Sequence, residues 1–544
     1  MNSATYLKNN LKNFPNEPAL SIKGSSGEWE TDNWSKFHES VIEVSKSLLA
    51  CGINSQDKIS IYSYNRKEWH YCYSAAQYIN AVGVGVYHTC SSNEVDWIVS
   101  NSESKIVFLG NNPNDNDEEL KMPNHRLLSV LDHLDKVELV VALPGIKMLK
   151  HDKIISWDDF IKKGKDIEIN EVESRFDEIK PEDTSALIYT SGTTGNPKGV
   201  ILTHDNWDFE CQQILTVAKF KPGDRSISWL PGAHVFGQAV DLHFTIRESM
   251  HTYIVDSPLN TVDYAKEIQP HLFISVPRIY EKVYSNFKSA IDSKAILKYG
   301  LHIPGLSTLL KKKLKAAAGF SNVTYAISGA APINPDILTL FQFLGIPLFE
   351  GYGLTESTAG ASLNYGLHNK IGSVGKLFPD TKAKINDDGE ILLQGRHIMK
   401  GYYKNEKASN ESLVDGWFLT GDVGKIDNDG FLYITGRKKE IYVSSAGKNI
   451  APLVIEETMK SIPIVSQCFL VGDNRNYCTA LFTLDVGAIL RDKIGMDATI
   501  IPKDPIKQLQ TLKENGFELV DFTNSDEIKK EMQNQVDVLN LKFS

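Results

Sequence analysis

The sequence predicts an α/β protein in which a large N-terminal domain of layered subdomains precedes a smaller α+β domain. With 544 residues the chain is longer than one hydrophobic core usually supports, so at least two domains are expected. Up to about residue 435, short β-rich runs alternate with segments of helical period, which is typical of largely parallel sheets covered by helices. In GDVGKIDNDGFLYITGRKKEIYV (421–443) turn-rich stretches such as DNDG separate short strands. We therefore place a domain boundary near residues 436–440, with domains at 1–436 and 437–544.

Composition narrows the class of protein. Hydrophobic residues make up 42% and charged residues 23% of the chain, values typical of a folded globular protein. The net charge of -10 argues against a nucleic-acid partner, because such proteins need a surplus of basic residues. The six cysteines lack CxxC spacing, which indicates a reducing compartment. Neither a signal peptide nor a membrane-spanning run is recognisable, so we expect a cytoplasmic protein with at most peripheral membrane contact. The oligomeric state stays open.

The strands of the large domain are predicted from β-rich runs. In chain order they are DKISIYSY (57–64), SKIVFLG (104–110), VELVVAL (137–143), ALIYTS (186–191), HTYIVD (251–256), LFISV (272–276) and TYAISG (324–329). One helix follows them, capped by Asn334, with Pro335 in its first turn and Gly345 at its end. Next comes IPLFEGYG (346–353), a strand that runs into a glycine-containing loop, where α/β proteins tend to place ligands.

The small domain has two recognisable features. The runs VSQCFLVG (465–472) and CTALFTL (478–484) predict a hairpin or two neighbouring strands. Apolar residues at helical spacing after Ser525 predict a final amphipathic helix that this serine caps.

A loop that binds phosphate is predicted at YTSGTTGNPKGV (189–200), directly after a strand. Its glycines allow backbone amides to approach an anion, its hydroxyls donate hydrogen bonds, and Lys198 adds positive charge. The string is not the Walker pattern, because Gly199 follows the lysine. A mobile surface loop is the ordinary alternative for such a composition, but the length of the string favours a phosphate cradle.

Further motifs follow in a recognisable order. They are LPGAHVFGQ (230–238), SVPRIYEK (275–282), ISGAAP (327–332), EGYGLTES (350–357), GEILLQGRHIMKGYY (389–403), GWFLTGDVG (416–424) and GRKKEIYVSSAGKNIAP (436–452). With the phosphate loop, this set resembles the adenylate-forming enzymes: acyl-CoA synthetases, firefly luciferase and the adenylation domains of peptide synthetases. The VPRIYEK block and the spacing are most similar to long-chain fatty acyl-CoA synthetases, including the bubblegum type. The resemblance covers nearly the whole chain.

The resemblance implies a ligase for medium- or long-chain fatty acids that uses ATP, Mg²⁺ and coenzyme A. A carboxylate would attack ATP and release pyrophosphate, and the thiol of coenzyme A would then replace AMP. A fatty carboxylate is already ionised at neutral pH, so positioning and charge neutralisation are the catalytic task. Two alternatives stay open: a fatty acyl-AMP ligase that serves a carrier protein, and a nucleotide- and acyl-binding protein with little catalysis.

The resemblance also implies the roles of particular residues around the phosphates. Thr355 would contact the α-phosphate, Arg437 would add charge near the sugar and α-phosphate, and Glu356 would hold Mg²⁺. The phosphate loop would supply Thr190, Ser191, Gly192, Thr193, Thr194, Gly195 and the catalytic Lys198, with Thr193 also at the metal. An isolated glutamate in a loop is more often merely solvated, but the full EGYGLTES string favours function.

The remaining implied roles concern adenosine, the acyl chain and coenzyme A. Tyr352 would face adenine and Asp422 would accept the ribose hydroxyls, although a turn-capping aspartate is the plain alternative. The loops around the adenosine would be formed by Gly329, Ala330, Ala331, Glu350, Gly351 and Gly353. The acyl chain would lie against His234, Val235, Phe236 and Gly237, and Gly447 would face the pantetheine. For His234, a packed and hydrogen-bonded histidine that does not contact the substrate is an equally good alternative.

The small domain of this family rotates between the two half-reactions, and Lys439 matches the hinge position. Relatives carry a lysine in a late glycine-containing loop that serves adenylation, and no matching loop follows the final helix here. On this ground the sequence predicts slow adenylation with thioester formation retained.

Overall fold

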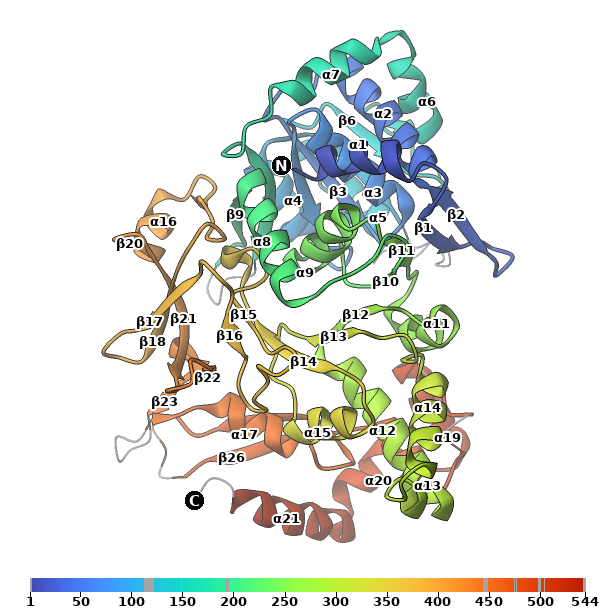
Figure 1. Cartoon of the computed structure of the whole chain (residues 1–544), viewed down its shortest axis with the longest axis vertical. Coiled ribbons are helices and arrows are strands. Elements are labelled where there is room, and N and C mark those ends of the chain that lie inside the picture. Colours follow the sequence, from blue (N-terminus) through green and yellow to red (C-terminus); the bar gives the residue numbers. More distant parts are fainter. Residues whose placement is uncertain are drawn as a thin grey trace.

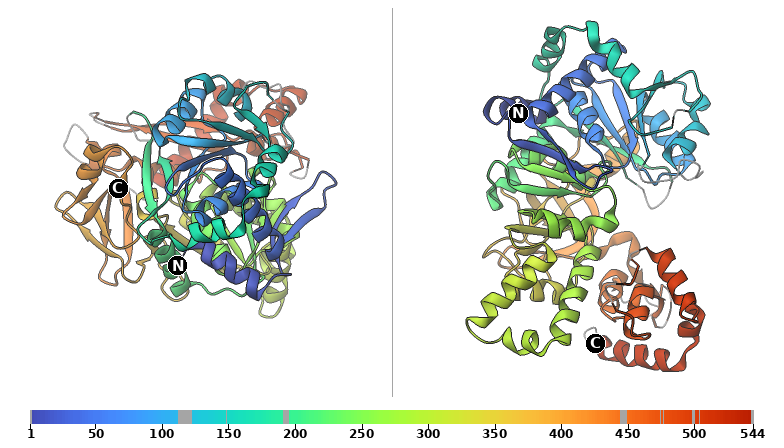
Figure 2. Two further views of the ribbon diagram at one scale, coloured as in Figure 1. Left: turned by 90° about the horizontal axis from the view of Figure 1, so that it is seen from above. Right: turned by 90° about the vertical axis from the view of Figure 1, so that its right-hand side faces the viewer.

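The computed structural model describes residues 2–111, 122–147, 149–190, 195–443, 449–473, 475, 477–497, 500–502 and 504–541. The chain builds an N-terminal layer of sheet and helices, a second sheet with its own helices, a small side sheet and a C-terminal lobe (Figures 1 and 2). No helix among these residues has both the length and the apolar character needed to cross a bilayer.

The first sheet has eight strands, and six of them are parallel. Their order is β19 (Gly401–Tyr402), β9 (Lys198–Thr203), β8 (Thr184–Thr190), β4 (Val82–Val86), β3 (Lys58–Ser63), β5 (Ser104–Gly110), β6 (Leu139–Ala142) and β7 (Ile154–Ser156). β9 runs antiparallel to β8 and to β19, and the others are parallel. The helices of this part are α1 (Ser3–Asn13), α2 (Trp34–Ala50), α3 (Lys67–Tyr78), α4 (Ser92–Ser102), α5 (Pro123–Leu128), α6 (Trp157–Lys163) and α7 (Ile169–Asp177), with single turns η1 (Leu131–His133) and η2 (Gly164–Asp166).

The second sheet has nine strands and borrows two of them from the start of the chain. Their order is β16 (Lys376–Leu377), β15 (Ser362–Leu363), β14 (Leu348–Tyr352), β13 (Tyr325–Ser328), β12 (Leu272–Ser275), β10 (Arg225–Ser228), β11 (His251–Ile254), β1 (Pro18–Lys23) and β2 (Trp29–Asn33). Its helices are α8 (His204–Val217), α9 (Val235–Gly237), η3 (Gln238–Phe244), α10 (Thr245–Arg247), η4 (Pro258–Asn260), α11 (Thr261–Ile268), α12 (Pro277–Ser293), α13 (Ala295–Gly300), α14 (Leu306–Ala318), α15 (Pro335–Phe343) and η5 (Thr355–Ser357). The strands from β14 to β1 are parallel, so their carboxyl ends meet at one edge.

The side sheet and the C-terminal lobe complete the chain. The side sheet contains β17 (Lys382–Ile385), β18 (Glu390–Gln394), β21 (Trp417–Ile426), β20 (Leu413–Val414) and β22 (Leu432–Arg437), with α16 (Glu406–Ser412). The lobe contains η6 (Lys438–Glu440), β23 (Tyr442–Val443), β24 (Asn449–Ile450), α17 (Pro452–Met459), β25 (Val465–Val471), β26 (Thr479–Leu484), α18 (Val486–Asp492), α19 (Pro505–Glu514), α20 (Leu519–Asn524) and α21 (Asp526–Asn540). The buried residues of its core all lie between Met459 and Ile528.

The α/β fold class is confirmed, and so are the individual elements. Each predicted β-rich run of the large domain contains an observed strand, and β25 pairs with β26 as an antiparallel hairpin. Asn334 caps α15 by accepting a hydrogen bond of 2.8 Å from the Asp336 amide. Ser525 likewise caps α21 through the Ile528 amide. These elements were predictable because caps and apolar periodicity are local signals.

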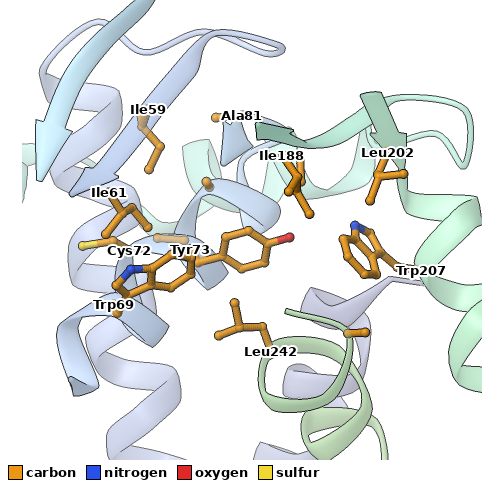
Figure 3. Close-up of a cluster of buried hydrophobic side chains, with 14 of the residues drawn as sticks. Ile59, Ile61, Trp69, Cys72, Tyr73, Ala81, Ile188, Leu202, Trp207 and Leu242 are labelled. Carbon is orange, nitrogen blue, oxygen red and sulfur yellow. The ribbon is translucent and has the colours of Figure 1, made fainter. Parts of the chain in front are cut away.

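Aromatic side chains fill the space between the first sheet and α8 (Figure 3). Trp69 and Tyr73 stack with centroids 5.6 Å apart, and the Tyr73 hydroxyl lies 3.0 Å from Nε2 of His243. His243 in turn stacks on Trp207 at 4.4 Å. Tyr73 fits against β4 because Gly83 has no Cβ, which would lie 2.7 Å from the tyrosine ring. This packing fixes η3, the segment that follows His234.

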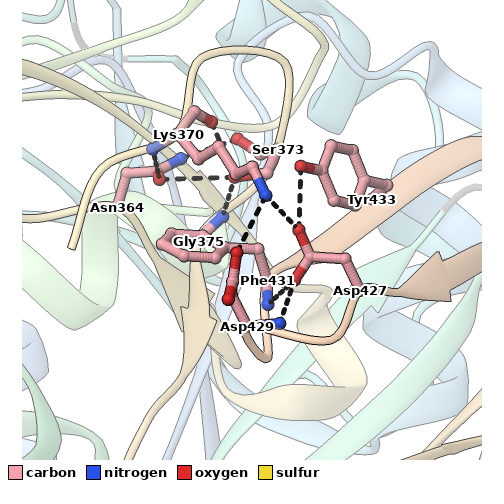
Figure 4. Close-up of polar contacts among 8 residues, drawn as sticks. All are labelled: Asn364, Lys370, Ser373, Gly375, Asp427, Asp429, Phe431 and Tyr433. Carbon is pink, nitrogen blue, oxygen red and sulfur yellow. Dashed lines mark hydrogen bonds and ion pairs between the residues drawn. The ribbon is translucent and has the colours of Figure 1, made fainter.

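A polar clamp joins the loop before β16 to the turn between β21 and β22 (Figure 4). Lys370 Nζ lies 2.6 Å from Asp427 Oδ2 and 3.3 Å from Asp429 Oδ2. The hydrogen bond from Lys370 lowers the pKa of Asp427 to about 2. Beside the clamp, Gly375 approaches the backbone of β15 so closely that a Cβ would lie 1.9 Å from the Leu363 carbonyl carbon.

We expect Gly375→Ala to destabilise the protein much more than Gly372→Ala does. Both glycines have left-handed backbones, with φ of +88° and +86°, so each alanine costs about 1–2 kcal/mol. Only at Gly375 does the new methyl group meet backbone atoms, which adds about 1–3 kcal/mol. Urea unfolding of both variants measures the difference. Equal losses would show that the approach of Gly375 to β15 does not constrain the fold.

Candidate active site

The predicted phosphate loop connects β8 to β9, and both of its ends are held in place. Thr190 and Lys198 are register partners at the ends of the two strands. Trp97 of α4 donates a hydrogen bond of 2.9 Å from its indole nitrogen to the Pro197 carbonyl. Gly195 has a φ of +101°, which favours glycine. Ser191, Gly192, Thr193 and Thr194 lie outside the described residues, as does Gly447.

Lys198 and Glu356 come together through a residue that the sequence did not single out. Lys198 Nζ lies 4.9 Å from the ring centroid of Tyr402, close enough for a cation–π contact. The Tyr402 hydroxyl donates a hydrogen bond of 2.8 Å to Oε1 of Glu356. The only sequence signal for Tyr402 was its place in the motif GEILLQGRHIMKGYY. Its position beside Lys198 depends on the pairing of β19 with β9, which no local pattern reveals.

The loop that carries Thr355 and Glu356 is tightly folded. The Leu354 amide donates to the Ser357 hydroxyl at 2.9 Å, and the Met399 amide donates to the Glu356 carbonyl at 2.8 Å. A Cβ on Gly353 would lie 2.0 Å from the Ala359 carbonyl oxygen, so the turn requires glycine. Thr355 begins this turn and is half-buried. These contacts hold the backbone around Glu356, whose side chain is half-buried.

Asp422 lies at the centre of a second cluster. Its Oδ2 accepts a hydrogen bond of 2.6 Å from the Tyr352 hydroxyl, and its Oδ1 lies 3.0 Å from Nε of Arg437. Burial raises the pKa of the Asp422 carboxyl, while Arg437 and the tyrosine hydroxyl act in the opposite direction. The charge of Glu356 also raises the pKa of Asp422, so the two clusters are electrostatic neighbours.

The turn that presents Asp422 is itself held by a buried carboxylate. The Gly421 amide donates to Oε1 of Glu390 at 2.9 Å, and the other oxygen of Glu390 binds Lys438 Nζ at 2.9 Å. The sequence reasoning assigned no role to either Glu390 or Lys438. Both are positioned by the antiparallel sheet of β18, β21 and β22.

The predicted adenine wall, residues 329–331, directly follows β13. The neighbouring strand β14 carries the other predicted adenosine-site residues Glu350, Gly351 and Tyr352. Ser328 and Glu350 are register partners at the ends of these parallel strands. Ala330 has a φ of +67°, a left-handed conformation that is unusual outside glycine, and it is exposed together with Ala331. Burial raises the pKa of Glu350 to about 8, and its Oε1 accepts from the Ile333 amide at 3.3 Å. The Glu350 carboxyl is therefore buried and bound by a backbone amide of the segment that follows the adenine wall.

The four predicted acyl-site residues lie at the start of α9. Nδ1 of His234 accepts a hydrogen bond of 3.0 Å from the Phe236 amide, and burial lowers the pKa of the imidazole. Val235 is buried, and Gly237 leaves no room for a Cβ, which would lie 2.7 Å from the Pro231 carbonyl oxygen. The ring of Phe236 lies 3.1 Å from where a Cβ of Gly329 would be. The proposed acyl and adenine residues thus meet at this contact.

Comparisons with known proteins agree with this geometry. Residues 7–403 match the model of the family described as AMP-binding enzyme. The chain is 31% identical over 488 residues to the long-chain-fatty-acid–CoA ligase FadD15 of Mycobacterium tuberculosis, covering 84% of this chain and 78% of the relative. It is also 31% identical to the human long-chain-fatty-acid–CoA ligase ACSBG2, covering 88% of this chain and 76% of the relative.

Solved structures show the same fold. One is the o-succinylbenzoate CoA synthetase MenE of Bacillus subtilis in complex with its acyl-adenylate intermediate, with a TM-score of 0.68, 22% identity and 88% of each chain covered. Another is the anthranilate CoA ligase AuaEII in complex with anthranoyl-AMP, with a TM-score of 0.72, 18% identity, and 95% of this chain and 97% of that chain covered. On the family match and the 31% identity to two ligases over most of its length, this chain belongs to the AMP-binding enzymes.

Proposed function

We propose that this enzyme is an AMP-forming ligase that joins a medium- or long-chain fatty acid to coenzyme A. The observation that carries the proposal is the position of Glu356, which binds Tyr402 beneath Lys198 and also acts on the charge of Asp422. Residues suited to the phosphates, the metal and the ribose therefore form one continuous site. The names and substrates of the relatives supply the chemical class.

The predicted site residues are proposed to bind different parts of ATP and the fatty acid during adenylation. Lys198 offers positive charge at the end of the phosphate loop, and Arg437 offers it beside Asp422. Asp422 is oriented by Tyr352 and Arg437 to accept the ribose hydroxyls. His234, held neutral by burial, and Phe236 are proposed to border the carboxyl end of the fatty acid. Because the fatty carboxylate is already ionised, these groups orient it and offset charge instead of removing a proton.

Mg²⁺ is the expected companion of ATP, and Glu356 suits it. Tyr402 occupies one carboxylate oxygen, whereas no hydrogen bond or ion pair within the described chain engages the other. Mg²⁺ in nucleotide sites is usually bound by one or two carboxylates together with phosphates and waters. When bound, the ion would neutralise charge on the phosphates. Thr193, the second proposed ligand, lies outside the described residues.

We further propose that residues 437–544 form the smaller domain and that the hinge lies at Lys439. The core of the C-terminal lobe uses only residues of its own, which supports a separate unit. Lys438 is bound to Asp388 and Glu390 of the side sheet, so the chain is still anchored to the large domain at that residue. A pivot directly after Lys438 would leave these ion pairs intact.

The function is tested by pyrophosphate release across fatty acids of graded length, with and without coenzyme A. We expect turnover with long acids and AMP release that depends on coenzyme A. Acyl transfer to a carrier protein alone would support an acyl-AMP ligase instead. Binding of nucleotide and fatty acid with no turnover would refute the proposed activity.

We predict that Lys198→Ala and Glu356→Ala reduce turnover more than they weaken AMP binding, since both act on the phosphate and metal side. Loss of one such contact typically costs about 2.7–4 kcal/mol of transition-state stabilisation.

Tyr402→Phe should reduce turnover less, by about 1.5 kcal/mol of transition-state stabilisation, because the ring beneath Lys198 remains and only the hydrogen bond to Glu356 is lost. Steady-state rates and calorimetric titration with AMP measure both effects. Lys407→Ala, at an exposed lysine on α16, is the control, and unchanged turnover in Glu356→Ala would exclude that residue from the mechanism.

Tyr352→Phe should weaken AMP binding about tenfold, because the freed Asp422 oxygen loses its charge-assisted hydrogen bond. The KM for the fatty acid should not change. Tyr433→Phe is the matched control, since its hydroxyl also binds an aspartate, Asp427, but at the polar clamp. Equal AMP affinities in the two variants would contradict a role for Tyr352 in the nucleotide site.

A further inference from the structure

The helical hairpin of α13 and α14, here called the basic hairpin (residues 294–318), differs in charge from the rest of the chain. It contains six lysines and no aspartate or glutamate, although the whole chain has a net charge of -10. The acid-free stretch extends from residue 293 to residue 335. Lys311 lies over the ring of Phe343 and Lys315 donates to the Gly345 carbonyl, but none of the six lysines forms an ion pair with a described carboxylate. A concentrated, uncompensated positive charge on an acidic protein indicates an anionic partner.

The same hairpin exposes large apolar side chains. Ile296 is 64% exposed, Tyr299 67%, Ile303 50% and Leu309 62%. Lys298 on α13, its N-cap Lys294, and Lys312 and Lys313 on α14 are exposed as well. Ile296 and Tyr299 are three residues apart and so share one face of α13, and exposed apolar side chains bordered by polar ones are typical of binding surfaces.

These side chains are not a loosely packed part of the core, because the hairpin has its own buried face. Leu297, Leu301, Leu310 and Leu314 are buried and belong to the core of the second sheet. Gly300 permits this contact, since a Cβ there would lie 2.8 Å from Leu310 Cδ1. Gly305, with a φ of +82°, makes the turn into α14. The hairpin lies at the outer edge of the molecule, at the lower right of Figure 1, and carries the exposed side chains named above.

We propose that the basic hairpin docks the enzyme on an anionic lipid surface. Lysines attract acidic headgroups, and exposed isoleucine, leucine and tyrosine side chains enter the boundary between headgroups and acyl chains. A nucleic acid would match the lysines but not the exposed isoleucines and leucine. The choice of lipid also rests on the proposed function, because a long-chain fatty acid resides in membranes.

The test is sedimentation of the full-length protein with vesicles of phosphatidylcholine alone and of phosphatidylcholine mixed with phosphatidylserine. The unmodified protein should bind the anionic vesicles at least about tenfold more strongly. Salt at 0.5 M, which shortens the Debye length to about 4 Å, should reduce this binding. Lys312→Glu combined with Lys313→Glu should abolish the preference. Lys163→Glu combined with Lys165→Glu changes the charge equally at the far end of the molecule and should bind as the unmodified protein does.

A second variant distinguishes insertion of the apolar side chains into the lipid from electrostatic attraction of the lysines to an anion. Ile296→Ser combined with Ile303→Ser keeps every lysine and should lower vesicle binding while leaving binding to heparin, a soluble polyanion, unchanged. Equal binding of all variants to anionic vesicles would overturn the proposal, and so would binding to heparin or RNA without binding to vesicles. Pyrophosphate release measured without vesicles reports on the proposed activity separately, so the two proposals fail independently.

Discussion

The hydrogen bonding of β9 on both of its edges is the constraint on which the site depends. β9 pairs with β8 through Thr190 and Lys198, and with β19 through Val200 and Tyr402. The first pairing closes the phosphate loop, and the second places the Tyr402 ring against the lysine. Without this strand the loop and the glutamate of η5 would have no fixed relation to each other.

Electrostatic compensation around the site follows from that placement. The protein brings several carboxylates close to where a polyanionic nucleotide is proposed to bind. The partners that offset the negative charge differ from one carboxylate to the next. Asp422 has Arg437 and Tyr352 as partners, and Glu390 has Lys438 and a backbone amide. Glu350 lacks a cation, and its raised pKa of about 8 favours the neutral acid at neutral pH. Glu356 is different again, because the one hydrogen bond to its carboxylate within the described chain comes from Tyr402 and leaves the second oxygen available.

The charges on the basic hairpin are arranged differently from those in the candidate active site. Charge in the site is paired at short distances, whereas the lysines of the basic hairpin have no acidic partners among the described residues. Unpaired charge on a surface acts over about a Debye length and attracts extended partners. One chain thus separates short-range chemistry on small ligands from a longer-range attraction at the hairpin.

The sequence by itself determined the fold class, the strands that lie in the β-rich runs, the capped ends of α15 and α21, and the set of motifs that belongs to the AMP-binding enzymes. These were predictable because apolar periodicity, capping and glycine spacing act over a few neighbouring residues. Only the tertiary structure decided that Tyr402 joins Lys198 to Glu356, that Lys438 and Glu390 support the turn of Asp422, and that β1 and β2 complete the second sheet. The basic hairpin could also be recognised only in the tertiary structure. Its lysines and apolar residues can be read from the sequence, but the exposure of their side chains cannot. The physical reason is that strand pairing and burial depend on contacts between segments far apart in the chain, which no local pattern records.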